Sequence, residues 1–169
     1  MSENEIMKLM DTINYGWIDK KAIKHIDDFD TFSSDYVLQS PEEVKKNQIG
    51  VCWDQVELER EYFKNYKSVK TFFMVYYDNN KCPTHTFLTF EKNNKYYWFE
   101  HSWNKFKGIH KYDSIKDLLI GVKQYFIKFE LKNNYNKNNL IIREYTKPKY
   151  NISVQDFFKH CEKGEIIEI

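Results

Sequence analysis

The chain has 169 residues, of which 41% are hydrophobic, 18% aromatic and 30% charged, a composition typical of a folded globular protein. Its net charge of +1, from 26 basic and 25 acidic side chains, argues against a nucleic-acid-binding protein with a broad basic surface. The three cysteines have no disulfide-framework spacing, and no apolar stretch approaches the length of a membrane span. We therefore expect a single cytoplasmic domain over residues 1–169, with no membrane and no nucleic-acid partner.

The first third of the chain is predicted to be mainly helical. Apolar residues at helical spacing predict a helix over residues 3–13, and a short helix is expected near Lys20–Ile26. The dipeptide Ser40-Pro41 is typical of a helix start, with Ser as N-cap and Pro at the first helical position. Gly50 breaks that helix, and another is expected over Cys52–Tyr66.

The remainder is predicted to hold the strands. Runs rich in β-branched and aromatic residues predict strands at Val69–Asp78, Thr84–Lys92, Lys95–His101 and Leu140–Tyr145. Helices are expected at Ser114–Phe129 and Ser153–Cys161, and the polar run Lys132–Asn139 is predicted to be a loop. Helices followed by an antiparallel meander, and then by a helix, a strand and a helix, favour the α+β class.

Cys52 is the candidate nucleophile. It stands between Gly50 and a helical pattern, so it is expected at a helix N-terminus, where unpaired N–H groups stabilise a thiolate and can hold a developing oxyanion. Gly50 would let a substrate backbone approach closely. Taken alone, a cysteine is most often a small buried hydrophobic residue.

His85 is the candidate base, because a thiol nucleophile needs a partner that takes and returns its proton. It opens a predicted strand, which holds a side chain in a defined direction. Of the other histidines, His25 and His160 are expected at the surface, and His110 is expected in a loop after Gly108.

The register of the predicted hairpin selects the carboxylate beside His85. If Asn93-Asn94 is a two-residue turn, Phe87 lies opposite Glu100. Residues that pair across a hairpin share a face, and so do residues two apart on one strand. His85 and Glu100 therefore share a face, while His101 falls on the opposite one. Glu100 would hold the imidazole in position and stabilise its protonated form.

Three short motifs in this order resemble the transglutaminase-like superfamily: Gly-Val-Cys-Trp at 50–53, Thr-His-Thr-Phe at 84–87 and Trp-Phe-Glu-His-Ser-Trp at 98–103. They span about a third of the chain. Glu100 stands where the family more often has Asp, and Val51 where true transglutaminases usually have Gln. The resemblance implies a papain/transglutaminase-like α+β fold, in which the nucleophile helix packs on an antiparallel β-sheet that supplies the His and the acid.

The resemblance also implies acyl transfer at a thiol, without a metal or other cofactor. The expected activity is that of a cysteine protease or amidase acting on a peptide or protein substrate, with transamidation to an amine as the alternative. Gln48 is a candidate second donor to the oxyanion. Trp53, Trp98 and Trp103 are candidate walls of the cleft, although aromatic residues at such spacings more often belong to a core.

Other interpretations stay open at this point. Cys82 and His85 have the spacing of metal ligands, and His101 or His110 could join them, although no second paired motif appears. A binding module that keeps the fold without catalysis is a second alternative, and an arylamine acetyltransferase-like acyl carrier a weaker third. Glu59 and Arg60 are expected to form a partly buried structural pair.

Overall fold

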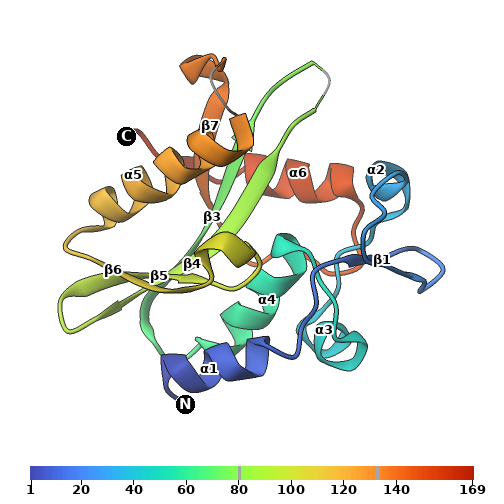
Figure 1. Ribbon diagram of the computed structural model, residues 1–169, viewed down its shortest axis with the longest axis horizontal. Helices are drawn as coiled ribbons and strands as arrows, with labels where there is room; N and C mark the ends of the chain where they lie inside the picture. Colours follow the sequence, from blue (N-terminus) through green and yellow to red (C-terminus); the bar gives the residue numbers. More distant parts are fainter. Residues whose placement is uncertain (80, 132–133) are drawn as a thin grey trace.

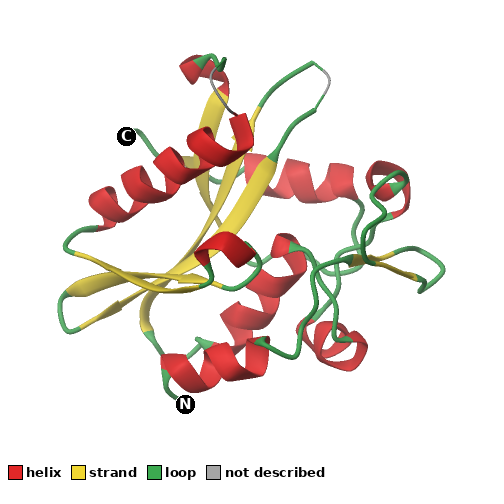
Figure 2. Cartoon of the chain, viewed as in Figure 1, coloured by secondary structure: helices red, strands yellow, loops and turns green. Residues whose placement is uncertain are grey.

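The computed structural model describes residues 1–79, 81–131 and 134–169 and has the α+β architecture expected from the sequence (Figures 1 and 2). Its helices are α1 (Glu3–Met10), α2 (Phe32–Asp35), α3 (Pro41–Asn47), α4 (Cys52–Tyr62), α5 (Ile115–Phe126) and α6 (Val154–Glu162). Its strands are β1 (Trp17–Ile18), β2 (Lys24–His25), β3 (Lys67–Tyr76), β4 (Thr84–Lys92), β5 (Lys95–Glu100), β6 (Gly108–Tyr112), β7 (Leu140–Tyr145) and β8 (Glu165–Ile166). Single turns of 3₁₀ helix lie at Asn104–Phe106 and Lys137–Asn139, and a π-helical turn lies at Ile127–Leu131.

The larger sheet has the strand order β6-β5-β4-β3-β7-β8, and all its pairings are antiparallel. Strands β3 to β6 form a meander in chain order, and the chain returns through α5 to place β7 beside β3. The β4–β5 hairpin has the predicted register, since Lys92 pairs with Lys95 and Leu88 with Phe99. Asn93 and Asn94 have φ values of 53° and 57°, which Asn tolerates better than most residues.

The two faces of this sheet bury different helices. On β4, Leu88 and Phe90 pack with α1 and α4, whereas Phe87 packs with the apolar face of α5. On β3, Phe73 joins a third cluster that includes Trp53 of α4 and Phe157 of α6. The helices α4 and α6 therefore lie on one side of the sheet and α5 on the other, as the ribbon in Figure 1 shows.

Local sequence patterns correctly predicted where most of the helices begin. Ser40 and Ser153 cap α3 and α6 as predicted, and Ser40 accepts a hydrogen bond from the Glu43 N–H while Glu43 reaches back to the Ser40 N–H. The helix α3 ends before Gly50, because Gln48 takes the left-handed conformation (φ 55°) at its C-terminus. Leu9, one of the apolar residues that predicted α1, is exposed instead of buried.

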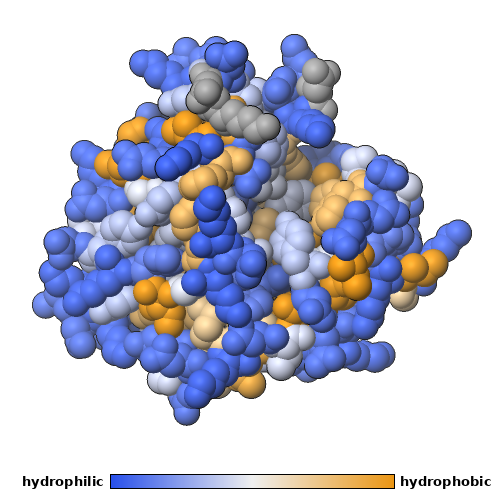
Figure 3. Space-filling model, viewed as in Figure 1, coloured by the Kyte–Doolittle hydropathy of each residue, from blue (hydrophilic) through white to orange (hydrophobic). Residues whose placement is uncertain are grey.

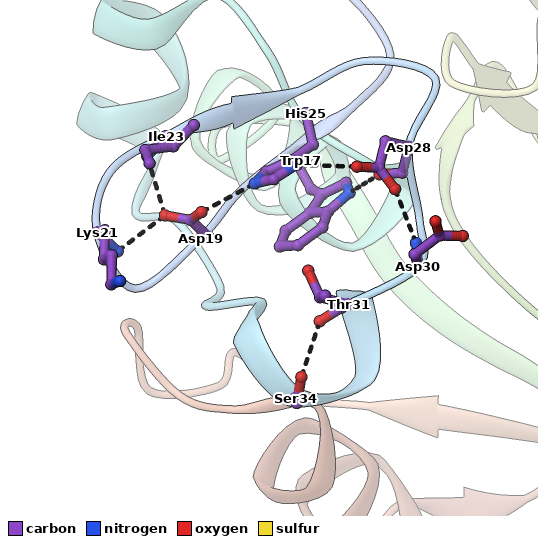
Figure 4. Close-up of polar contacts among 9 residues, drawn as sticks. All are labelled: Trp17, Asp19, Lys21, Ile23, His25, Asp28, Asp30, Thr31 and Ser34. Atoms are coloured by element: carbon purple, nitrogen blue, oxygen red, sulfur yellow. Dashed lines mark hydrogen bonds and ion pairs between the residues drawn. The ribbon is translucent and has the colours of Figure 1, made fainter.

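The helix expected near Lys20–Ile26 was a wrong prediction, since this segment forms the β1–β2 hairpin. Its side chains offer the backbone other partners: the Asp19 carboxylate accepts hydrogen bonds from the N–H groups of Lys21 and Ile23. His25 stacks on Trp17 at 4.1 Å between ring centroids and bonds Asp19 at 2.8 Å, as Figure 4 shows. The expectation of a surface position for His25 is therefore only partly correct.

The same hairpin projects from the body of the molecule, at the right of Figure 1, and carries exposed apolar side chains, among them Ile23 and Ile26. Figure 3 shows this apolar surface on the projecting hairpin. Within the described ranges, no helix combines the length and apolar character needed to cross a lipid bilayer. Of the predicted loop Lys132–Asn139, residues 132 and 133 lie outside the described residues.

Candidate functional site

The candidate nucleophile occupies the first position of α4, as predicted. Val51 precedes the helix in an extended conformation, and Cys52 is 7% exposed. The first N–H groups of a helix have no acceptor within it, so the Cys52 N–H is available to a negatively charged oxygen. This end of α4 can therefore stabilise both a thiolate and an oxyanion.

Two residues of the same turn hold the loop before Cys52. The Asp54 carboxylate, which is fully buried, accepts hydrogen bonds from the N–H groups of Val51 and Gln39 and from the Tyr36 hydroxyl at 2.9–3.0 Å. The Gln55 amide donates to the Gly50 carbonyl at 2.8 Å. Burial raises the pKa of Asp54 to about 7, against the effect of these three donors.

His85 reaches Cys52 because β4 is longer than its neighbour. The pairing of β4 with β5 ends at Leu88, while β4 continues back to Thr84 along β3. Helix α4 packs against β4, and Cys52 and His85 line the same cavity.

Glu100 is the carboxylate that lies beside His85, as the hairpin register predicted. Its Oε2 lies 2.7 Å from His85 Nε2 and also accepts a hydrogen bond from the Trp98 indole N–H at 3.2 Å. Its Oε1 accepts hydrogen bonds from the Ser102 hydroxyl at 3.0 Å and from the Trp103 N–H at 2.8 Å. Since Nε2 is used by Glu100, Nδ1 is the ring nitrogen that remains for another partner.

The electrostatics favour the protonated form of the His85 imidazole. Burial of His85 opposes its charged form, but the interactions with Glu100 and Cys52 outweigh burial and raise the pKa of His85 to about 10. Near neutral pH, the ring can therefore donate from Nε2 to Glu100 and carries a second N–H at Nδ1.

Cys52 and His85 open into a cavity of about 260 Å³. It is lined by Tyr15, Cys52, Thr84, His85, Ser102, Trp103, Phe126 and Glu130. Of the predicted cleft residues, only Trp103 is among these lining residues. The centroids of the Trp103 and His85 rings are 4.9 Å apart, in an edge-to-face arrangement. Trp53 and Trp98 are core residues, although each donates its indole N–H toward the site, Trp53 to Thr84 and Trp98 to Glu100.

The structure does not bring Gln48 or Gly50 into the cavity lining. Gln48 is exposed, and its carbonyl accepts the Asn14 N–H. Gly50 is buried, and a Cβ there would lie 2.8 Å from the Asp54 Cβ, so its small size serves packing against α4 rather than a substrate backbone. Sequence reasoning missed Tyr15 and Glu130, which come from distant segments and carry no motif. It also missed Asp54, although an acidic residue two positions into a helix is a common capping signal.

The other histidines and the second cysteine have separate roles. His101 lies away from Glu100, as the register predicted, and its Nδ1 bonds Gln55 at 2.6 Å. His110 was expected in a loop but lies on β6, opposite Trp98, because a short strand after Gly108 completes the meander. Cys82 is exposed and contacts the Asp78 carbonyl. Across residues 1–79, 81–131 and 134–169, no three His, Cys, Asp or Glu side chains are grouped to hold a metal ion, so the spacing of Cys82 and His85 does not assemble such a site.

The expected pairing of Glu59 with Arg60 was wrong. Adjacent residues on a helix point in different directions, and Arg60 instead pairs with Glu57, three positions earlier, at 3.0 Å. Glu59 Oε2 is buried and has no hydrogen-bond donor among the residues described. Burial, followed by repulsion from Glu100, raises the pKa of Glu59 well above its usual range, which favours its protonated form.

The chain was also compared with known proteins. No protein-family model matches the sequence, and no curated protein matches it either. The chemistry assigned to this chain therefore depends on the geometry of Cys52, His85 and Glu100.

Proposed function

We propose that this protein is a thiol hydrolase that cleaves amide or peptide bonds through a covalent acyl-enzyme on Cys52. One observation carries the proposal: Cys52 begins α4 and faces His85 in a shared cavity, while Glu100 holds the far side of the His85 ring at 2.7 Å. A nucleophile, a base and an orienter joined in this order are the parts that acyl transfer requires.

The reaction starts with attack of the Cys52 thiolate on the carbonyl carbon of the substrate, which forms a carbon–sulfur bond. The Cys52 N–H at the start of α4 holds the resulting oxyanion, and the Tyr15 hydroxyl in the same cavity is a better placed second donor than Gln48. The His85 imidazolium gives its Nδ1 proton to the leaving nitrogen as the carbon–nitrogen bond breaks. A water molecule then gives a proton to His85, attacks the thioester and releases the acid, which restores the thiolate.

The papain/transglutaminase-like arrangement is part of the same proposal. A nucleophile helix that packs on an antiparallel sheet supports it, as does the origin of His85 and Glu100 on adjacent strands of that sheet. Water as acceptor gives a protease or amidase, and an amine gives a transamidase. These steps on a peptide or protein substrate require no metal or other cofactor.

Trapping the acyl-enzyme tests the proposal. The protein is mixed with a panel of peptide esters and glutamine amides, quenched in acid, and analysed by mass spectrometry of its peptides. We expect an acyl adduct on Cys52 in the wild type and a loss of turnover of about 10³-fold or more in Cys52→Ala and His85→Ala. The ratio of acid to amide products, measured with an added alkylamine, separates hydrolysis from transamidation.

Iodoacetamide labelling near pH 6 provides the internal control, because Cys82 is an exposed cysteine of the same chain. We expect Cys52 to be alkylated faster than Cys82, and His85→Ala to remove this difference. Equal rates in the wild type, together with no acyl adduct from any substrate, would mean that the chain is a binding module and not an enzyme.

A further inference from the structure

The cavity beside Cys52 has an acidic and aromatic outer wall. Its described lining contains three aromatic rings besides His85, those of Tyr15, Trp103 and Phe126, and one carboxylate, that of Glu130. No lysine or arginine is among these lining residues, although 26 of the 169 residues of the chain are basic. Among these lining residues, Glu130 is therefore the one carboxylate that a cationic group of a substrate could approach.

Glu130 lies on the irregular continuation of α5. The α-helix α5 ends at Phe126 and continues as a π-helical turn over Ile127–Leu131, and both Phe126 and Glu130 line the cavity. Single π-helical turns are rare and are frequent at functional sites. Phe126 and Glu130 are four residues apart, so they lie on the same side of this helical segment.

Tyr15 connects Glu130 with the nucleophile. Tyr15 is 47% exposed as a residue, but desolvation of its phenol, followed by the electrostatic effect of Cys52 and Glu130, raises the pKa of Tyr15 above its usual range. The phenol is therefore a neutral hydrogen-bond donor near neutral pH. A group that contacts Glu130 and Tyr15 lies in the same cavity into which Cys52 opens.

We propose that this wall selects acyl substrates with an ammonium or guanidinium group on the residue that acylates Cys52; this inference rests on the proposed hydrolase function. A cation gains from a carboxylate and from the faces of aromatic rings at the same time. The volume of about 260 Å³ suits one side chain and its carbonyl group. A neighbouring hollow shares Glu130, and its lining includes Phe29, Phe32, Asp78 and Lys81, which gives the rest of a peptide an apolar path with charged groups of both signs.

Charged thiol reagents test whether the cavity beside Cys52 prefers cations, and they require no knowledge of the natural substrate. The rates of reaction of Cys52 with 2-aminoethyl and 2-sulfonatoethyl methanethiosulfonate are measured in Cys82→Ser protein and divided by the rates for free cysteine. We expect this cation-to-anion ratio to exceed one and to fall by about 5- to 25-fold in Glu130→Gln, with a smaller difference at high salt. Glu165→Gln, a change on the distant strand β8, should leave the ratio unchanged.

Matched peptide substrates complete the test. Arginine and citrulline have nearly the same shape and differ in charge, so a pair of esters with either residue at the acyl position isolates the charge. We expect kcat/KM to favour arginine by about 10-fold in the wild type and by less than about 2-fold in Glu130→Gln. Equal acylation by both esters, with a reagent ratio that Glu130→Gln does not change, overturns the inference and leaves the hydrolase intact. Absence of any Cys52 adduct refutes the proposed function instead.

Discussion

Glu100 on β5 and Glu59 on α4 have different surroundings although they are equally buried, each 2% exposed. At the end of β5, Glu100 accepts hydrogen bonds from Trp98, Ser102 and the Trp103 N–H and pairs with His85. In the middle of α4, Glu59 has one oxygen for which the described residues supply no donor. Both side chains are glutamate, so residue type and burial do not explain the difference between them.

The donors around each carboxyl explain it. A carboxylate survives burial where several N–H and O–H groups point at it, and it takes up a proton where they do not. The surroundings of Glu100 therefore supply several hydrogen-bond donors to a carboxyl group beside the His85 imidazolium. The surroundings of Glu59 favour its protonated form, and its side chain is buried between α4 and the sheet.

The largest expected effect is on the rate of acylation. Glu100→Gln keeps the shape but removes the charge beside His85, so we expect the acylation rate to fall by about 10³- to 10⁴-fold. The matched change Glu59→Gln should alter the rate less than about 3-fold. Burst kinetics with an activated ester measure both, and circular dichroism confirms that both variants fold. Equal losses in the two variants would show that the two regions do not differ in function.

The titration of His85 sharpens the comparison. Its pKa is raised to about 10, so its ring signals in NMR spectra should titrate well above the ordinary range near 6.5. In Glu100→Gln, burial remains and the main favourable partner is lost, so the pKa should fall by more than about 2 units. A His85 pKa near 6.5 in the wild type would contradict the assigned ion pair.

The same titration has a consequence for stability. A pKa that is raised on folding means that the folded state binds the proton more tightly than the unfolded state. The contribution of protonated His85 is therefore complete below about pH 6.5 and is lost as the pH rises through about 10.

Glu59 makes stability depend on pH in the same direction, from a lower pH. Its raised pKa destabilises the fold as the pH rises above the unfolded value of about 4.5. Glu59→Gln should remove up to about 1.4 kcal/mol per pH unit from the slope of the unfolding free energy against pH. Urea denaturation at several pH values between about 5 and 8 measures this slope. An unchanged slope would mean that Glu59 is charged in the folded protein.

The smallest expected effect comes from a single donor to Glu100. Trp98→Phe removes the indole N–H at 3.2 Å and leaves three partners, so we expect acylation to slow by about 3- to 10-fold and the pKa of His85 to shift slightly. Trp53→Phe is the matched control, because it removes an indole N–H that donates to Thr84 instead. The control should lose comparable stability without moving the titration of His85.

Much of the candidate site was predictable because its signals are local. A turn of two asparagines set the register of β4 and β5, and that register put His85 and Glu100 on one face. A glycine before a helical pattern placed Cys52 at a helix start. The hairpin at Lys20–Ile26 was not predictable in this way, because it depends on Asp19 and on the stacking of His25 upon Trp17.

The sequence by itself determined the elements that carry Cys52, His85 and Glu100 and the face of the sheet on which the last two lie. Turn, capping and alternation patterns act over a few residues, so they can be read without the fold. Only the tertiary structure decided that β4 extends past β5 toward Cys52, that Glu59 stays without a donor, and that Tyr15 and Glu130 share one cavity. These contacts join segments far apart in the chain, and their free energies depend on packing that no local pattern encodes.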